Sequence, residues 1–182
     1  MNVGVFKLFA AEEISAIFSQ IDINFINPET QDVIDGVNVG ELARMQISLG
    51  VASNIDTDST SIRIDLSNDN FYFTSFTPNG DEDGATYSVV VEDSTQGTKT
   101  LTAVLHIDAD GTRYITIDDL LQGSTVYLSL DGYFKDTVTP NEKLSVSVGG
   151  QEYATISVKN VENKITIDNL SLIHIWRCRR IR

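Results

Sequence analysis

The stretch ARMQISLGV, residues 43–51, alternates apolar and polar side chains along its length. The apolar positions are Ala43, Met45, Ile47, Leu49 and Val51, and the polar positions between them are Arg44, Gln46 and Ser48. A period of two is typical of a β-strand with one face toward a core and the other toward water. Residues 43–51 therefore predict a half-buried strand.

The same alternation returns through most of the chain. IDINFIN, residues 21–27, and SIRIDL, residues 61–66, repeat it most clearly. Further strands are expected around residues 71–76, 86–92, 100–107, 113–118, 125–134, 144–148, 153–159 and 165–168. About eleven short strands separated by turn-forming residues are typical of an antiparallel β-sandwich of the Ig-like or jelly-roll type. We therefore predict an all-β fold.

Two other features complete the predicted layout. Residues 11–20 have helical spacing, so a short N-terminal helix, or the remnant of a signal peptide, is expected within residues 1–20. The turn DADGT, residues 108–112, indicates a hairpin in which Gly111 takes a positive φ. We expect residues 21–169 to form a single β-sandwich domain.

Residues 170–182, LSLIHIWRCRRIR, differ from the rest of the chain. They hold the only tryptophan, the only cysteine and four of the arginines. LSLIHI resembles the translated end of a sequencing transposon, and WRCRR resembles the adapter that follows it. The resemblance implies a non-native tail that replaces the natural C-terminus. The competing hypothesis is a basic tail that binds a membrane or a nucleic acid.

The charge of the remaining chain restricts its partners. Without the four arginines of residues 170–182, nine basic residues stand against 26 acidic ones, which gives a net charge of −17. Such a body repels nucleic-acid phosphates and anionic lipid surfaces, so we expect neither a nucleic acid nor a membrane as partner. Because this part of the chain has no cysteine, disulfides and thiolate metal sites are also excluded.

We expect no cofactor, but the acidic turns suggest a candidate calcium (Ca2+) site. Paired acidic residues occur in the turns NIDTDSTS, NGDEDG and HIDADG. Their candidate ligands are Asp56, Asp58, Asp81, Asp83, Asp108 and Asp110. Calcium prefers six to eight oxygen ligands, and none of the three turns completes a twelve-residue calcium loop. The alternative is that aspartate and glycine simply form the turns.

Aromatic side chains mark a second candidate site. Tyr72 alternates with Phe71 and Phe73, so it points away from the face that those two residues share. Three further tyrosines, Tyr114, Tyr127 and Tyr133, follow in predicted strands. Together the four tyrosines suit a ligand-binding surface, for example for a glycan. The alternative is that they lie in the core or under a loop.

The sequence offers little for catalysis. His106 is the only histidine before the tail, and no nucleophile motif accompanies it. Phosphate-binding glycine loops are absent. Paired carboxylates of the kind used in glycoside hydrolysis remain an alternative among 26 acidic residues, but sequence spacing does not fix their separation in the fold. We therefore expect a protein that is not an enzyme.

DADGTRYITIDDLLQGSTVYLSLDGYFKDTVTPNEKLSVSV, residues 108–148, resembles segments of large Gram-positive cell-surface proteins, and VNVGELARMQISLGV, residues 37–51, resembles the opening of their adhesin-type domains. The resemblance implies an exported domain at the cell wall or cell surface. Its expected role is structural or adhesive, with a host matrix protein, a glycan or neighbouring domains of the same protein as partner. Two alternatives stay open, namely a carbohydrate-binding module of a secreted glycan-degrading protein and a glycoside hydrolase fragment.

Overall fold

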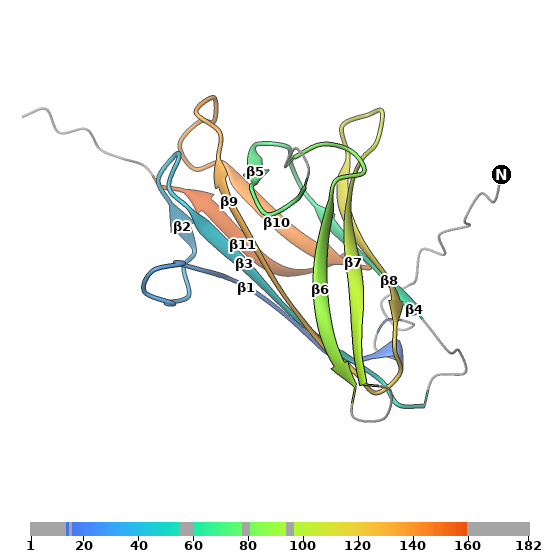
Figure 1. The fold of residues 1–182 in the computed structure, drawn as a ribbon. Coiled ribbons are helices and arrows are strands. Elements are labelled where there is room, and N and C mark those ends of the chain that lie inside the picture. The colour runs from blue at the N-terminus through green and yellow to red at the C-terminus, as the bar shows by residue number, and fades with distance from the viewer. Residues whose placement is uncertain (1–13, 15, 55–59, 78–80, 94–96, 160–182) are drawn as a thin grey trace, which may run out of the picture.

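The structure is a computed structural model that describes residues 14, 16–54, 60–77, 81–93 and 97–159. The described part is all-β, with two sheets of four and seven strands. The prediction of an all-β fold is therefore confirmed, and the two sheets form a β-sandwich-like architecture (Figure 1).

The strands follow the hydrophobic alternation of the sequence. They are β1 Phe18–Ile26, β2 Gly36–Val37, β3 Ala43–Val51, β4 Thr60–Leu66, β5 Phe71–Phe73, β6 Thr86–Asp93, β7 Gly97–Ile107, β8 Arg113–Leu120, β9 Thr125–Phe134, β10 Lys143–Val148 and β11 Gln151–Val158. Gly111 has φ of 86°, as the DADGT turn predicts. Most strands of the described part thus lie where the alternation predicts them.

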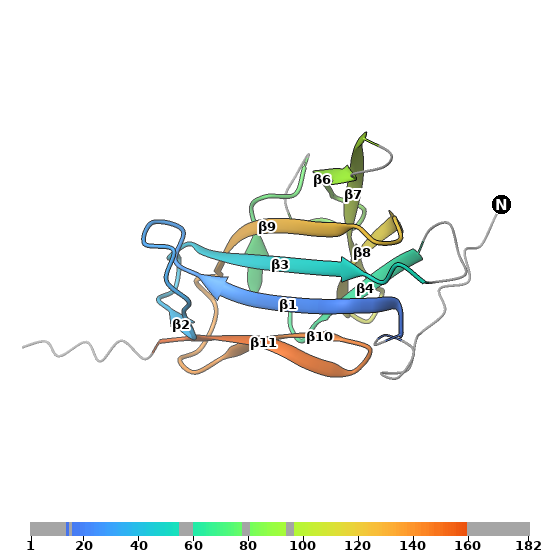
Figure 2. The ribbon, with the colours of Figure 1, turned by 90° about the horizontal axis from the view of Figure 1, so that it is seen from below.

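Strand order shows how the two sheets are assembled. The four-stranded sheet has the order β1-β3-β9-β5, and the seven-stranded sheet has the order β2-β11-β10-β4-β8-β7-β6. Every pair of neighbouring strands is antiparallel except β2 and β11, which are parallel. The larger sheet curves around the smaller one, so that β11 lies beside β1 and β6 contacts β9 (Figure 2).

The core lies between the two sheets. In β3, Met45, Ile47 and Leu49 are buried, and their cross-strand partners in β9 are also buried. Removing one such aliphatic side chain typically costs about 2–5 kcal/mol. At the β5 end, Phe71 packs edge-on against Phe25, Phe73 and Phe134. Apolar burial on the inner face therefore fixes which residues point outward.

One glycine makes the β5–β9 contact close. A Cβ atom at Gly132 would collide with the ring of Phe71 and with the carbonyl oxygen of Tyr72. Gly132 lies opposite Phe73, next to the pair formed by Tyr72 and Tyr133. Because glycine has no Cβ, β9 can approach β5 at this point and seat Phe71 in the core.

Several boundaries differ from the sequence-based expectation. The predicted helix over residues 11–20 is wrong at its end, because Phe18 begins β1; most of its earlier residues lie outside the described part. The short strand β2 was not predicted, since two residues are too few to show a period. The expected strand at residues 165–168 and the tail at 170–182 lie outside the described residues. No helix among the described residues is long and apolar enough to cross a membrane.

Candidate functional site

The outer face of the four-stranded sheet carries three of the four predicted tyrosines. Tyr127 and Tyr133 point outward from β9, and Tyr72 points outward from β5 directly opposite Tyr133. We call this surface the tyrosine face. Its members are Tyr72, Tyr127 and Tyr133 together with Asp22, Asn24, Arg44, Gln46, Ser48, Ser129 and Asp131.

The tyrosines stand at the two ends of this face. Tyr127 is 70% exposed, and it is the only aromatic side chain of the described residues that is largely exposed. At the other end the rings of Tyr72 and Tyr133 lie 5.4 Å apart with a tilt of 35°. Tyr133 lies six positions after Tyr127 along β9, which corresponds to about 20 Å at roughly 3.3 Å per residue.

Polar side chains fill the space between the tyrosines. Ser48 lies opposite Tyr127, and Gln46 lies opposite Ser129 with Asn24 beyond it on β1. Among the described residues, the side chains of Asn24, Gln46 and Ser129 are exposed and form no hydrogen bond with another described residue. Their amide and hydroxyl groups can both donate and accept hydrogen bonds. The tyrosine face therefore has aromatic side chains at its two ends. Between them lies a row of uncharged polar side chains, Asn24, Gln46 and Ser129, which we call the polar floor.

An ion pair interrupts this floor beside Tyr133. Arg44 donates from Nε and Nη2 to the two carboxylate oxygens of Asp131, at 2.6 and 3.0 Å. The hydrogen bond with Asp131 raises the pKa of Arg44 above its ordinary value. The backbone N–H of Asp131 in turn donates to Ser75 Oγ at 2.7 Å. Because Arg44 is paired with Asp131, the only cation among the residues of the tyrosine face already has its counterion.

The fourth tyrosine lies on the other sheet, in a stacked cluster of Arg63, Asp65, His106, Tyr114 and Thr116. Arg63 Cζ stands 3.7 Å from the ring centroid of Tyr114, and the ring of His106 stacks on Tyr114 at 4.8 Å. Arg63 donates to Asp65 at 2.7 Å, and His106 Nε2 lies 2.9 Å from Thr116 Oγ1. Burial, followed by the charge of Asp108, raises the pKa of Tyr114. The aromatic ring of Tyr114 is therefore engaged by the protein itself.

Three of the predicted calcium ligands form hydrogen bonds with the backbone, two within their own turn and one with the end of β7. Asp83 Oδ1 accepts from the backbone N–H of Ile107 at 2.9 Å, and Asp110 Oδ1 accepts from that of Thr112 at 2.9 Å. The second bond lowers the pKa of Asp110. Asp108 closes the same turn through its own backbone N–H, which donates to the carbonyl of Thr112. These bonds stabilise the loop geometry whether or not a cation is present.

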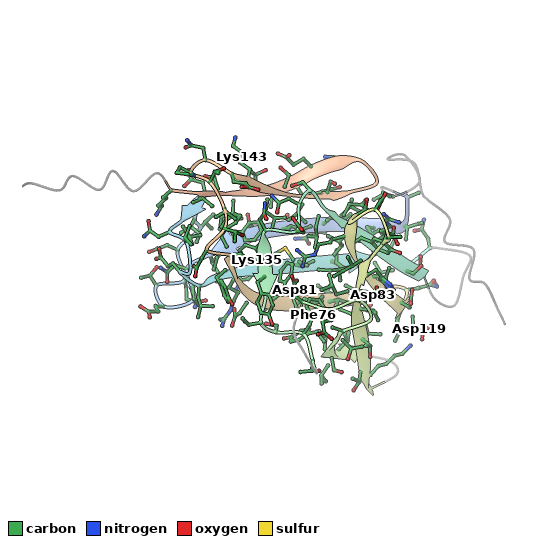
Figure 3. The ribbon with its side chains drawn as sticks, turned by 90° about the horizontal axis from the view of Figure 1, so that it is seen from above. Phe76, Asp81, Asp83, Asp119, Lys135 and Lys143 are labelled. Carbon is green, nitrogen blue, oxygen red and sulfur yellow. The ribbon has the colours of Figure 1, made fainter. Side chains whose placement is uncertain are left out.

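Asp81 has a different partner, the buried guanidinium of Arg113. Arg113 Nη2 donates to Asp81 Oδ1, and Nη1 donates to the carbonyl oxygen of Phe71 at 2.9 Å. Lys135 Nζ lies 3.6 Å from the other oxygen of Asp81 (Figure 3). The side chains of Arg113 and Asp81 are only 1% and 6% exposed. This ion pair connects the loop before β6 to the first residue of β8.

Burial dominates the titration of this pair. It raises the pKa of Asp81, and the nearby charges of Arg113 and Lys135 act in the opposite direction. Burial also lowers the pKa of Arg113, against the effect of Asp81. Within the described residues, Arg113 Nε is buried and has no hydrogen-bond partner. The loss of hydration therefore outweighs the mutual attraction of the two groups.

Sequence reasoning missed Arg113, although its position contained a signal. Arg113 has the same strand parity as Ile115 and Ile117, so the alternation places it on the inner face. An arginine at a core position requires a buried acidic partner. The candidates were the aspartates of the neighbouring turns, and the structure identifies Asp81.

The remaining calcium candidates, Asp56 and Asp58, lie outside the described residues. Across the described ranges, no group of three or more histidine, cysteine, aspartate or glutamate side chains is arranged to hold a metal ion. The best-formed candidate site in the described part of the chain is thus the tyrosine face. No protein-family model matches this chain, and comparison with curated proteins gives no match.

Proposed function

We propose that the chain is a non-catalytic domain that binds a ligand through the tyrosine face. The observation that carries this proposal is the 70% exposure of Tyr127 on an ordered strand whose other face is buried. An aromatic ring held at that exposure offers contact area at a low cost in conformational entropy. The rigid sandwich-like scaffold fixes the positions of the contact residues before a ligand arrives.

We further propose that the domain has an Ig-like or jelly-roll topology and belongs to a bacterial surface or secreted protein. The resemblance of residues 108–148 to Gram-positive surface proteins supports an extracellular location. The excess of acidic residues supports a domain that resists aggregation and non-specific adsorption. Candidate ligands are a glycan, a host matrix protein or a neighbouring domain.

A binding screen with surface variants tests this proposal. The full chain is applied to arrays of glycans and of matrix proteins such as collagen and fibronectin, with calcium and again with a chelator. Tyr127→Ala is the test variant, and Val90→Ala is the matched control. Val90 is 64% exposed on β6 of the other sheet, so both changes remove an exposed apolar side chain.

The expected result is a ligand whose capture weakens with Tyr127→Ala and persists with Val90→Ala. Capture that both variants retain places the contact elsewhere and overturns the proposed site. Loss of capture in chelator, with no effect of Tyr127→Ala, assigns binding to the acidic turns instead. A folded chain that captures nothing on either array contradicts a ligand-binding role.

A further inference from the structure

Resting on the proposed function, we infer that the occupant of the tyrosine face is a neutral glycan chain that lies along β9. One sugar ring packs on Tyr127, another packs on the pair formed by Tyr72 and Tyr133, and the rings between them contact Ser129 and Gln46. The separation of about 20 Å between the two aromatic ends leaves room for several sugar rings.

The aromatic ends fit the apolar faces of sugar rings. A pyranose ring carries C–H groups on its face and hydroxyl groups around its edge. Tyrosine has a matching division, because its ring is apolar and its hydroxyl is polar. Tyr127 is 70% exposed, and no aromatic partner among the described residues stacks on its ring. Its face is therefore available to a ligand, in contrast to that of Tyr114.

The floor between the aromatic ends fits hydroxyl groups. Asn24, Gln46 and Ser129 form a row across β1, β3 and β9. Sugar hydroxyls both donate and accept, and amide and hydroxyl side chains can satisfy both roles. Because these side chains have no hydrogen-bond partner within the described part of the chain, ligand binding need not break an existing bond.

Charge selects a neutral glycan over an acidic one. Arg44 already forms two hydrogen bonds with the carboxylate of Asp131, which offsets its positive charge and weakens its attraction for a second carboxylate. Asp22 adds an exposed carboxylate at the other end of the face. The rest of the body is strongly acidic. Uronate or sulfate groups would approach this surface against an unfavourable potential.

Exposed apolar area decides between a glycan and a protein. The large exposed hydrophobic side chains in the described residues are Val33, Val39, Leu42, Val90 and Tyr127. Of these, only Tyr127 lies on a strand of the four-stranded sheet. Stable protein interfaces need an apolar, well-packed centre, usually built from several anchoring side chains. The tyrosine face lacks such a centre and matches a hydroxylated, uncharged chain better.

Calorimetric titration of the full chain tests the inference. The neutral probes are cello-, xylo- and manno-oligosaccharides from disaccharide to hexasaccharide, and the charged probe is an oligogalacturonate series. At least one neutral series is expected to bind, with affinity that rises until the oligosaccharide spans both aromatic ends. Tyr127→Ala and Tyr133→Ala should each weaken binding of the long probes by about tenfold, the effect of losing one aromatic contact.

Two controls separate this inference from the proposed function. Val90→Ala should leave the affinity for the oligosaccharides unchanged. Tyr127→Ala should bind short and long oligosaccharides with the same affinity. The inference is overturned if no neutral oligosaccharide binds the folded chain, if the charged series binds more tightly, or if the tyrosine variants bind normally. If a matrix protein is captured in a Tyr127-dependent way while all oligosaccharides fail, the proposed function stands and only the glycan assignment falls.

Discussion

Two of the arginine–aspartate pairs in the described residues have the same chemistry but different surroundings. Arg113 and Asp81 lie inside the end of the sandwich, where their side chains are 1% and 6% exposed. Arg44 and Asp131 lie on the tyrosine face, where the corresponding values are 29% and 32%. The first pair is part of the scaffold and the second is part of the displayed surface. The difference teaches that burial, more than residue type, decides what an ion pair contributes.

Breaking one side of the buried pair should have the largest effect on stability. Arg113→Met leaves the carboxylate of Asp81 buried, with Lys135 as its remaining ion-pair partner among the described residues. We expect the free energy of unfolding to fall by about 3–5 kcal/mol, because an uncompensated buried charge is costly. Urea denaturation followed by circular dichroism measures the change. A loss comparable with that of an exposed pair would show that the end of the sandwich is open to water.

Replacing both partners should recover most of that loss. In Arg113→Met/Asp81→Leu no charge needs to be buried, and burial already disfavours the charged forms of both groups. We expect the double variant to lie within about 1 kcal/mol of the unchanged protein. The same urea titrations complete a double-mutant cycle. If the double variant is as unstable as Arg113→Met, the hydrogen bonds of Arg113 to backbone carbonyls carry the stability instead.

Breaking the surface pair should have a small effect. Arg44→Gln keeps a polar side chain and removes the charge beside Asp131. Partly exposed pairs are screened by solvent, so we expect a loss of about 0.2–1 kcal/mol that shrinks further in high salt. Urea titrations at low and high salt measure both values. A loss of several kcal/mol, independent of salt, would place this pair with the scaffold.

The smallest change in stability is expected for Tyr127→Ala. Its side chain is 70% exposed, so the unfolding free energy should stay within about 0.5 kcal/mol of that of the unchanged protein. Thermal and urea unfolding of the purified variant check this value. A larger loss would mean that Tyr127 supports the fold, and a binding defect of this variant could not then be assigned to the ligand.

Sequence pattern predicted the strands better than the site. The alternation in β3 and β9 fixes which residues face outward, so Tyr127 and Tyr133 could be placed on one side of one strand. It could not show that Tyr72 joins them and Tyr114 does not, because that depends on sheet order. The order of strands in a sheet arises from contacts between residues far apart in the chain, and local periodicity does not encode these contacts.

The acidic turns show the same limit. Asp81, Asp83 and Asp110 occupy similar aspartate-rich turns, yet one neutralises a buried arginine and the other two accept from backbone N–H groups. Turn chemistry alone makes the three equivalent. Only the position of Arg113 on the inner face of β8 distinguishes Asp81. Interpreting an acidic turn therefore requires knowing which cations the core encloses.

The placement of β1 and β11 has a mechanical consequence. The two strands lie side by side and run in the same direction, so that the start of β1 and the end of β11 lie at opposite ends of the described fold (Figure 2). Tension applied between these two points pulls β1 lengthwise past β3 rather than peeling it away. The hydrogen bonds along the register from Phe18↔Val51 to Ile26↔Arg44 then share the load and must rupture together. If the force acted on β1 at the turn after Ile26 instead, the hydrogen bonds between β1 and β3 would break one after another from that end.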